Sequence, residues 1–150
     1  MANLIKSTRG LDIPISGAAD KVLLGFQLSE IVAIVPDHYH GITPKLLVKE
    51  GEQVKAGTPI FYSKANERVK FVSPVSGKIV AINRGERRKI LNVLVERDAE
   101  IAYQAKEVPS LSTMQAEEIK ELLLQSGLWA YIKQRPYDII ADPNSTPKAI

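Results

Sequence analysis

The sequence predicts a mainly β fold followed by a short helical part. Two observations predict the β unit: between residues 48 and 83 glycines recur at turn positions, and short apolar runs rich in Val and Ile flank those turns. The helical part is predicted by a change of period after about Ser110, where apolar residues recur on one face. Tight turns and short strands are typical of a small sandwich or barrel.

A repeated spacing opens the glycine-punctuated stretch. Val48 and Val54 lie six positions apart, and so do Gly51 and Gly57. The pattern V-x-x-G-E-x-V-x-x-G-x-P, with S-P-x-x-G-x-[IV] at residues 73–79, resembles the biotinyl/lipoyl type of barrel-sandwich domain. The resemblance implies a barrel-sandwich hybrid unit, to which the sequence adds a C-terminal pair of short helices.

Domains of that type often carry a modified lysine at the tip of a hairpin between their two halves. Counting from Gly57, we expect this tip near Asn66-Glu67, and neither residue is lysine. Lys64 lies close by, but its neighbours Ser63 and Ala65 do not reproduce the acidic residue-Lys-Ala context of a lipoyl site. We interpret Lys64 as a solvated hairpin lysine. A lipoyl/biotinyl-type carrier domain stays open as an alternative function.

Before residue 48, the sequence predicts an irregular extended segment, a turn and a strand. Apolar residues alternate over residues 11–15, but Pro14 removes a ladder donor, so we expect an edge or irregular extended segment. Residues 16–19 resemble the Ser-Gly-Ala-Thr site where some respiratory subunits attach flavin, with Ala19 in place of the threonine. We interpret them as a turn. The continuous apolar run at residues 31–35 predicts a buried strand.

Both histidines of the chain, His38 and His40, lie in the loop after that strand. A His-x-His pair can supply two zinc ligands, but with no cysteine in the chain the remaining ligands would have to be carboxylates. We interpret the segment as a polar loop, with a metal site as the alternative.

The densest positive cluster lies in a turn before the strand expected at residues 90–96. It comprises Arg84, Arg87, Arg88 and Lys89. Several arginines near a turn can bind a phosphate, but the cluster has no interleaved aromatic residues on which bases could stack, so nucleic acid is not predicted. We interpret the cluster as a solvated hairpin with a modest role at an interface.

Two helices are expected near the C-terminus. Ser112 and Gln115 fit a capping box for the first, whose polar and apolar residues separate onto two faces, and Gly127 is expected to end it. Residues 128–134 predict a second short helix that closes before Pro136. Neither helix can bury its apolar face alone, so both must pack on the β unit, on each other or on a partner.

Composition limits the functional classes. The 150 residues contain no cysteine, which excludes disulfides, iron–sulfur ligation and thiol catalysis, and fits a cytosolic location. No apolar run approaches the roughly 18 residues of a membrane span. The net charge of +3 permits an acidic partner or an anionic membrane surface. We find no paired nucleophile and base, no metal set and no phosphate loop, so we assign no catalytic, cofactor-binding or metal residue.

We expect three parts along the chain: a β barrel-sandwich-like domain over 1–108, a helical appendage over 109–135 that packs on it, and a linker over 136–150. The last part is proline-rich, and its final residues, 148–150, resemble the start of an apolar strand. We therefore expect the chain to be a fragment whose linker leads into a following domain.

Taken together, the segments resemble the A-subunit family of the sodium-translocating NADH:quinone reductase. The glycine turns are shared with lipoyl domains and with the related C-subunit family of the Rnf electron-transfer complex, which stays an alternative. Three further motifs narrow the resemblance to the reductase family. They are Gly127-Leu128-Trp129, Gln134-Arg135-Pro136 and Thr146-Pro147-Lys148-Ala149. The other matching segments are residues 10–15, 49–57, 73–77, 81–86, 122–123 and 142–143.

The resemblance implies a peripheral protein on the cytoplasmic side of the bacterial inner membrane, within a complex that passes electrons from NADH to ubiquinone and exports sodium. It implies no cofactor in this chain; FMN, FAD, riboflavin and a 2Fe-2S cluster are expected in partner subunits. The expected partners are the other subunits of the complex, with ubiquinone nearby. A quinone site in this chain is a further alternative that rests only on the family's reaction.

We expect a structural and assembly role, in which the chain presents a docking surface to neighbouring subunits. Basic and aromatic residues dominate interface energies. The expected interface residues are Arg84, Arg87, Arg88, Trp129 and Arg135. For Trp129, simple filling of the core is an equal alternative.

Overall fold

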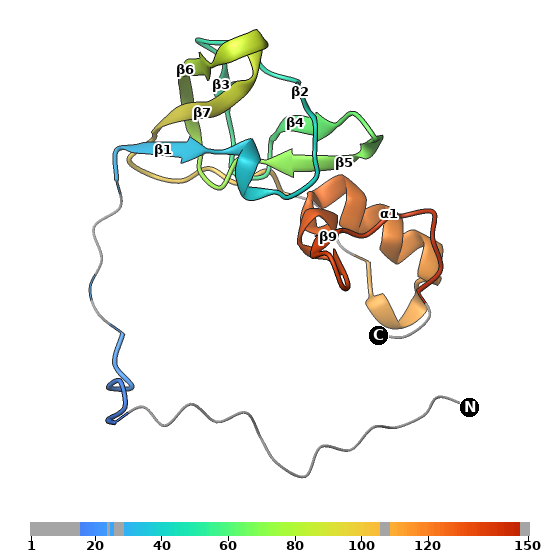
Figure 1. Ribbon diagram of the computed structural model, residues 1–150. Helices are drawn as coiled ribbons and strands as arrows, with labels where there is room; N and C mark the ends of the chain where they lie inside the picture. Colours follow the sequence, from blue (N-terminus) through green and yellow to red (C-terminus); the bar gives the residue numbers. More distant parts are fainter. Residues whose placement is uncertain (1–15, 24, 26–28, 106–108, 148–150) are drawn as a thin grey trace.

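The computed structural model describes residues 16–23, 25, 29–105 and 109–147 (Figure 1). The irregular segment expected at residues 11–15 and the apolar residues 148–150 lie outside these ranges. The predicted mainly β fold with a helical part is confirmed, because two antiparallel sheets form one unit and an α-helix follows it.

The first sheet has the strand order β1-β7-β6-β3 and the second has the order β2-β4-β5. The first consists of β1 (Ile31–Ile34), β3 (Gln53–Val54), β6 (Gly77–Arg84) and β7 (Ile90–Arg97). The second consists of β2 (Pro44–Leu46), β4 (Pro59–Ser63) and β5 (Asn66–Val72). The strands predicted at residues 31–35 and 90–96 are confirmed as β1 and β7. The predicted burial of the first is wrong except at Ile34, because β1 lies at the edge of its sheet and Ile31 is 53% exposed.

The core draws on both sheets. The rings of Phe61 on β4 and Phe71 on β5 stack with centroids 4.8 Å apart, and Val93 on β7 and Ile79 on β6 have no exposed surface. Each fully buried side chain of this size contributes about 1.5–3 kcal/mol to folding. The alternation of buried and exposed residues on β6 and β7 places one face of that sheet on the core.

The two glycines of the repeated spacing tie the halves of the β unit together. Gly51 and Gly57 lie in turns, as predicted, and have φ values of 84° and 95°, which glycine adopts without strain. The Gly51 N–H donates to the Ile79 carbonyl at 2.7 Å, and the Gly57 N–H donates to the Ser73 carbonyl at 2.8 Å. Each turn of the first half therefore hydrogen-bonds the second half.

The hairpin between β4 and β5 turns two residues earlier than predicted. Ser63 pairs with Asn66, which leaves Lys64 and Ala65 as the turn. The predicted tip at Asn66-Glu67 is therefore wrong. Register shifts in the β4–β5 ladder, one of them between Tyr62 and Ser63, break the even count on which the prediction relied.

The first predicted helix is α1 (Ala116–Ser126), but its cap is not Ser112. Gln115 is the N-cap, and its N–H donates to the Glu118 carboxylate at 2.7 Å in a capping box. The Ser112 hydroxyl instead lies 2.8 Å from that of Ser110, in the 3-10 turn η3 (Leu111–Thr113). The predicted end at Gly127 is confirmed, with φ 78°.

The second predicted helix is a 3-10 turn, η4 (Leu128–Tyr131), and the chain then becomes extended. Strand β8 (Lys133–Gln134) pairs with β9 (Ile139–Ile140), so part of the expected linker folds back on the helical part. Leu124 of α1 and Ala130 of η4 are buried with the β core, which packs the helical part against β5. Figure 1 shows α1 and β9 beside one another below β5.

Candidate interaction surface

The turn that joins β6 to β7 carries the predicted arginines on an unusual backbone. It is the segment η2 (Glu86–Arg88), a β-turn closed by hydrogen bonds from the Gly85 N–H to the Lys89 carbonyl at 2.8 Å and from the Lys89 N–H to the Glu86 carbonyl at 3.0 Å. Arg87 and Arg88 have φ values of 52° and 62°. A residue with a Cβ pays about 1–2 kcal/mol for this left-handed conformation.

The structure divides the predicted cluster of four cations into one paired lysine and three arginines. Lys89 Nζ lies 2.6 Å from Asp37 Oδ2, so this lysine forms an exposed ion pair with the loop after β1. Arg84 Nη1 donates to the Arg88 carbonyl at 3.4 Å. Within the described ranges, no carboxylate forms an ion pair with Arg84, Arg87 or Arg88, and all three are exposed. We call these three residues the arginine hairpin.

Trp129 and Arg135 do not join the arginine hairpin. Trp129 is half-buried against the hydrophobic core, and its Nε1 donates to the Ala141 carbonyl at 2.8 Å, which holds the C-terminal segment against η4. Arg135 is exposed in the turn between β8 and β9. Figure 1 shows the β6–β7 turn at the top of the β unit and β9 below that unit, beside α1. The five predicted interface residues therefore lie in two separate places.

The other residues singled out from the sequence lie on the surface. His38 and His40 are exposed, and among the described residues no group of three or more His, Asp or Glu side chains is placed to hold a metal ion. Lys64 is exposed at the tip of the β4–β5 hairpin, and its N–H donates to the Thr43 carbonyl at 2.9 Å. In the described part of the chain, no helix is both long and apolar enough to span a membrane.

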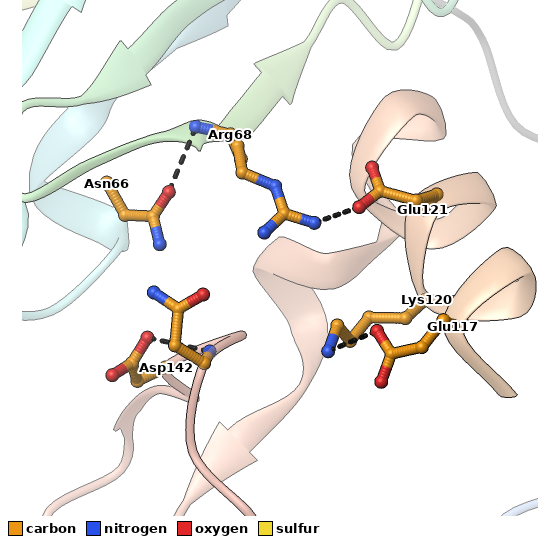
Figure 2. A network of polar contacts seen from close by, with 7 residues as sticks. Asn66, Arg68, Glu117, Lys120, Glu121 and Asp142 are labelled. Atoms are coloured by element: carbon orange, nitrogen blue, oxygen red, sulfur yellow. Dashed lines mark hydrogen bonds and ion pairs between the residues drawn. The ribbon is translucent and has the colours of Figure 1, made fainter.

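Sequence reasoning missed a polar network that joins the β unit to the helical part (Figure 2). Arg68 reaches from β5 to the Glu121 carboxylate on α1 and forms an ion pair with it, and the Arg68 N–H donates to Asn66 Oδ1 at 3.1 Å. Asn66 and Asp142 both line an open cleft of about 390 Å³ between the β4–β5 tip and the C-terminal segment. Arg68 and Glu121 lie 53 residues apart in the sequence, so no local pattern could have indicated this pair.

Tyr39 is a second junction that the sequence did not indicate. Its ring contacts that of Phe71 in the core, with centroids 4.4 Å apart, and that of Tyr131 in η4, with centroids 6.4 Å apart. Burial, together with a hydrogen bond and the charge of Tyr131, raises the pKa of Tyr39 to about 12. The phenol thus bridges the β core and the helical part in its neutral form.

Two family models match the chain. The model described as the NqrA N-terminal barrel-sandwich hybrid domain matches residues 5–98, and that described as the NqrA second alpha/beta domain matches residues 114–150. The first match confirms the predicted barrel-sandwich hybrid.

Curated relatives share one name, which designates the A-subunit protein of a Na(+)-translocating NADH-quinone reductase. The protein of Pseudomonas aeruginosa is 37% identical over 149 residues, that of Yersinia pseudotuberculosis 40% and that of Photorhabdus laumondii 38%. Each alignment covers 98% of this chain and 33–34% of the relative, so the chain spans about one third of the length of these proteins. The predicted resemblance is confirmed: the chain belongs to the NqrA N-terminal barrel-sandwich hybrid domain family.

Proposed function

We propose that this chain is a peripheral module of a Na⁺-translocating NADH:quinone reductase, in which it serves structure and assembly. The observation that carries the proposal is the match to the reductase relatives over 98% of the chain at 37–40% identity. The complex would transfer electrons from NADH to ubiquinone and couple this transfer to sodium export. The flavins and the iron–sulfur cluster would lie in the partner subunits, and the chain would lie on the cytoplasmic side of the membrane.

The architecture supports a docking role. The β unit is cross-tied through the turns at Gly51 and Gly57, and the helical part is fixed to it through Leu124 and the Arg68–Glu121 ion pair. A rigid unit of this kind presents its surface groups in constant positions, which lowers the entropic cost of binding. The arginine hairpin is the part of this surface that we expect to contact neighbouring subunits.

A charge-reversal experiment tests this role. Arg87→Glu with Arg88→Glu should lower the amount of the chain that co-purifies with the membrane subunits of the reductase from the host. The matched control is Lys55→Glu with Lys64→Glu, which changes the net charge equally at two exposed lysines, one next to β3 and the start of β6 and one in the β4–β5 turn. Quinone-dependent NADH oxidation by the same membranes should fall with the first variant and not with the second. Equal incorporation of both variants would remove the arginine hairpin from the assembly surface.

The carrier alternative and the Rnf alternative gain no support from the comparisons. The three relatives described above are all named as proteins of the Na(+)-translocating reductase. Lys64 does lie at a hairpin tip, but Ala65 beside it lines the cleft against the C-terminal segment. A modifying enzyme that must surround a free hairpin tip would meet that segment.

A further inference from the structure

Strand β1 is an open edge of the first sheet. The Arg97 N–H donates to the Glu30 carbonyl at 2.7 Å, so in the antiparallel ladder with β7 the hydrogen-bonded pairs continue at every second residue, starting with Val32. The N–H and C=O groups of Ile31 and Ala33 therefore point away from β7. Within the described part of the chain, these main-chain groups have no hydrogen-bond partner.

The edge at β1 differs from the other edges of the two sheets. An open edge is a template for pairing with another chain, and proteins usually protect it with a proline, a charge or a covering segment. Strand β2 begins with Pro44 and carries Lys45, and β5 packs against α1 and η4. Strand β3 is followed by Ala56, whose main chain hydrogen-bonds residues 102 and 104. In the described structure, β1, with the sequence Ile-Val-Ala-Ile, has none of these protections.

We propose that residues 11–15 pair antiparallel with β1 as an additional edge strand, so that the N-terminal part of the chain closes the first sheet. These residues lie outside the described ranges. The family model of the barrel-sandwich hybrid domain begins at residue 5 and therefore includes them. This contact needs no partner protein, so it does not depend on the proposed function.

The connection between the segment and β1 favours the antiparallel direction. Residues 16–30 can span up to about 50 Å, which is more than enough for an antiparallel return. A parallel return would need a crossover, which is usually a helix, and the described residues of this connection contain no helix.

The sequence of the segment fits an edge strand beside β1. In an extended strand, alternate residues direct their main-chain groups to the same side, and Leu11, Ile13 and Ile15 would direct theirs to β1. Pro14 then lies where the missing N–H would point to solvent, which is the position at which an edge strand tolerates proline. Asp12 adds a charge to the same outer side. The new edge would thus carry the proline and the charge that β1 lacks.

The apolar side chains of the segment match the face of the sheet that they would join. On the face opposite the core, β1 exposes Ala33 and 53% of Ile31, whereas Ile34 is buried. Ala33 pairs with Leu94 of β7, which is half-buried. Residues directly opposite one another in a ladder project from the same face, so the apolar residues of the segment would extend this apolar surface and cover Ile31.

Engineered disulfides test the contact, because the chain has no cysteine of its own. The register that pairs all three apolar residues of the segment with β1 and its continuation places Ile13 opposite Ala33. Residues in such a hydrogen-bonded pair have Cα atoms about 5.5 Å apart, which suits a disulfide. Ile13→Cys with Ala33→Cys should therefore form an intramolecular disulfide on treatment with copper phenanthroline. The matched control is Ile13→Cys with Lys45→Cys, whose second thiol lies on the exposed edge strand of the other sheet and should stay reduced.

Amide hydrogen exchange, followed by NMR, tests the contact without a covalent bond. The Ile31 and Ala33 amides should exchange at least about tenfold more slowly in the intact chain than in a chain that lacks residues 2–15. The Val32 and Ile34 amides, which face β7, should stay protected in both chains and so report that the shorter chain is folded.

A pair of proline variants gives the same test in the full-length chain. Ile13→Pro places a proline where the N–H would face β1 and should speed exchange of the Ala33 amide. Asp12→Pro is the matched control, because its N–H would face solvent, and exchange of the Ala33 amide should not change.

The outcomes are decisive for the edge strand. Equal oxidation of the control cysteine pair would refute the proposal, and so would Ile31 and Ala33 amides that exchange equally fast with and without residues 2–15. Protection that appears only at protein concentrations at which the chain dimerises would overturn the proposal, because a second copy would then cover β1. None of these measurements involves the reductase subunits, so the proposed function is tested separately.

Discussion

Gly77 is the position where one added methyl group should damage the fold most. It begins β6 and pairs with Val54 on one side and with Arg97 on the other. A Cβ at Gly77 would lie 1.9 Å from the carbonyl oxygen of Glu96, whereas carbon and oxygen atoms in sheets approach to about 3.3 Å. The clashing atom belongs to the main chain of β7, so no side-chain rotation relieves it.

The expected cost follows from comparison with Gly51. Gly51→Ala meets no atom within 4 Å and has φ 84°, so it should cost only the left-handed penalty of about 1 kcal/mol. Gly77→Ala must also push β6 and β7 apart, which raises its expected cost to roughly 3–5 kcal/mol. At about 2–4 °C per kcal/mol for a chain of this size, the melting temperature should drop by about 2–4 °C for Gly51→Ala and by at least about 6 °C for Gly77→Ala.

Thermal unfolding of the 150-residue chain, followed by circular dichroism, measures both values under one condition. If Gly77→Ala gives no folded protein while Gly51→Ala folds, the loss of stability at Gly77 is larger than expected and the reasoning is supported. Equal drops in melting temperature for the two variants would show that β7 moves away from a Cβ without cost. The close approach at Gly77 would then not contribute to the cost of the substitution.

Three further results are expected. Trp129→Phe removes the hydrogen bond to Ala141 while keeping an aromatic ring, and it should lower the free energy of unfolding by about 1 kcal/mol in urea titrations. Because folding raises the pKa of Tyr39 to about 12, the folded state holds this proton more tightly than the unfolded chain does; this contribution to stability is present below about pH 10 and is lost as the pH rises toward 12. Tyr39→Phe should flatten that decline in unfolding experiments over the same range, and an unchanged slope would contradict the assignment. The intact mass of the chain made in a lipoylating host should show no addition at Lys64, whereas a lipoyl mass increment would restore the carrier alternative.

The turns and the sheet could be predicted because their signals are local. Gly51 and Gly57 lie in short turns, where positive φ is a property of the residue itself and needs no knowledge of distant contacts. The same holds for Gly127 at the end of α1. The strand at residues 31–35 is marked by a continuous apolar run that ends at a proline.

The errors arise where tertiary pairing decides between local options. Ser112 is a better cap by propensity, yet α1 starts three residues later behind Gln115. Residues 128–134 contain enough apolar side chains for a helix, but pairing of β8 with β9 makes the second half extended. The hairpin tip lies at Lys64 because β4 and β5 shift register, and a residue count carries no information on such irregularities.

Positive φ occurs in two settings in this chain, at glycines and at the two arginines of the β6–β7 turn. At Gly51, Gly57 and Gly77 the residue without a Cβ satisfies it, and two of these backbones hydrogen-bond the other half of the fold. At Arg87 and Arg88 the same region is occupied by long cationic side chains, although a turn that merely joined two strands would be more stable with glycine. Both cases therefore follow from folding, because a two-residue turn between antiparallel strands favours positive φ at both central residues, and at Arg87 and Arg88 the chain meets that geometry without glycine.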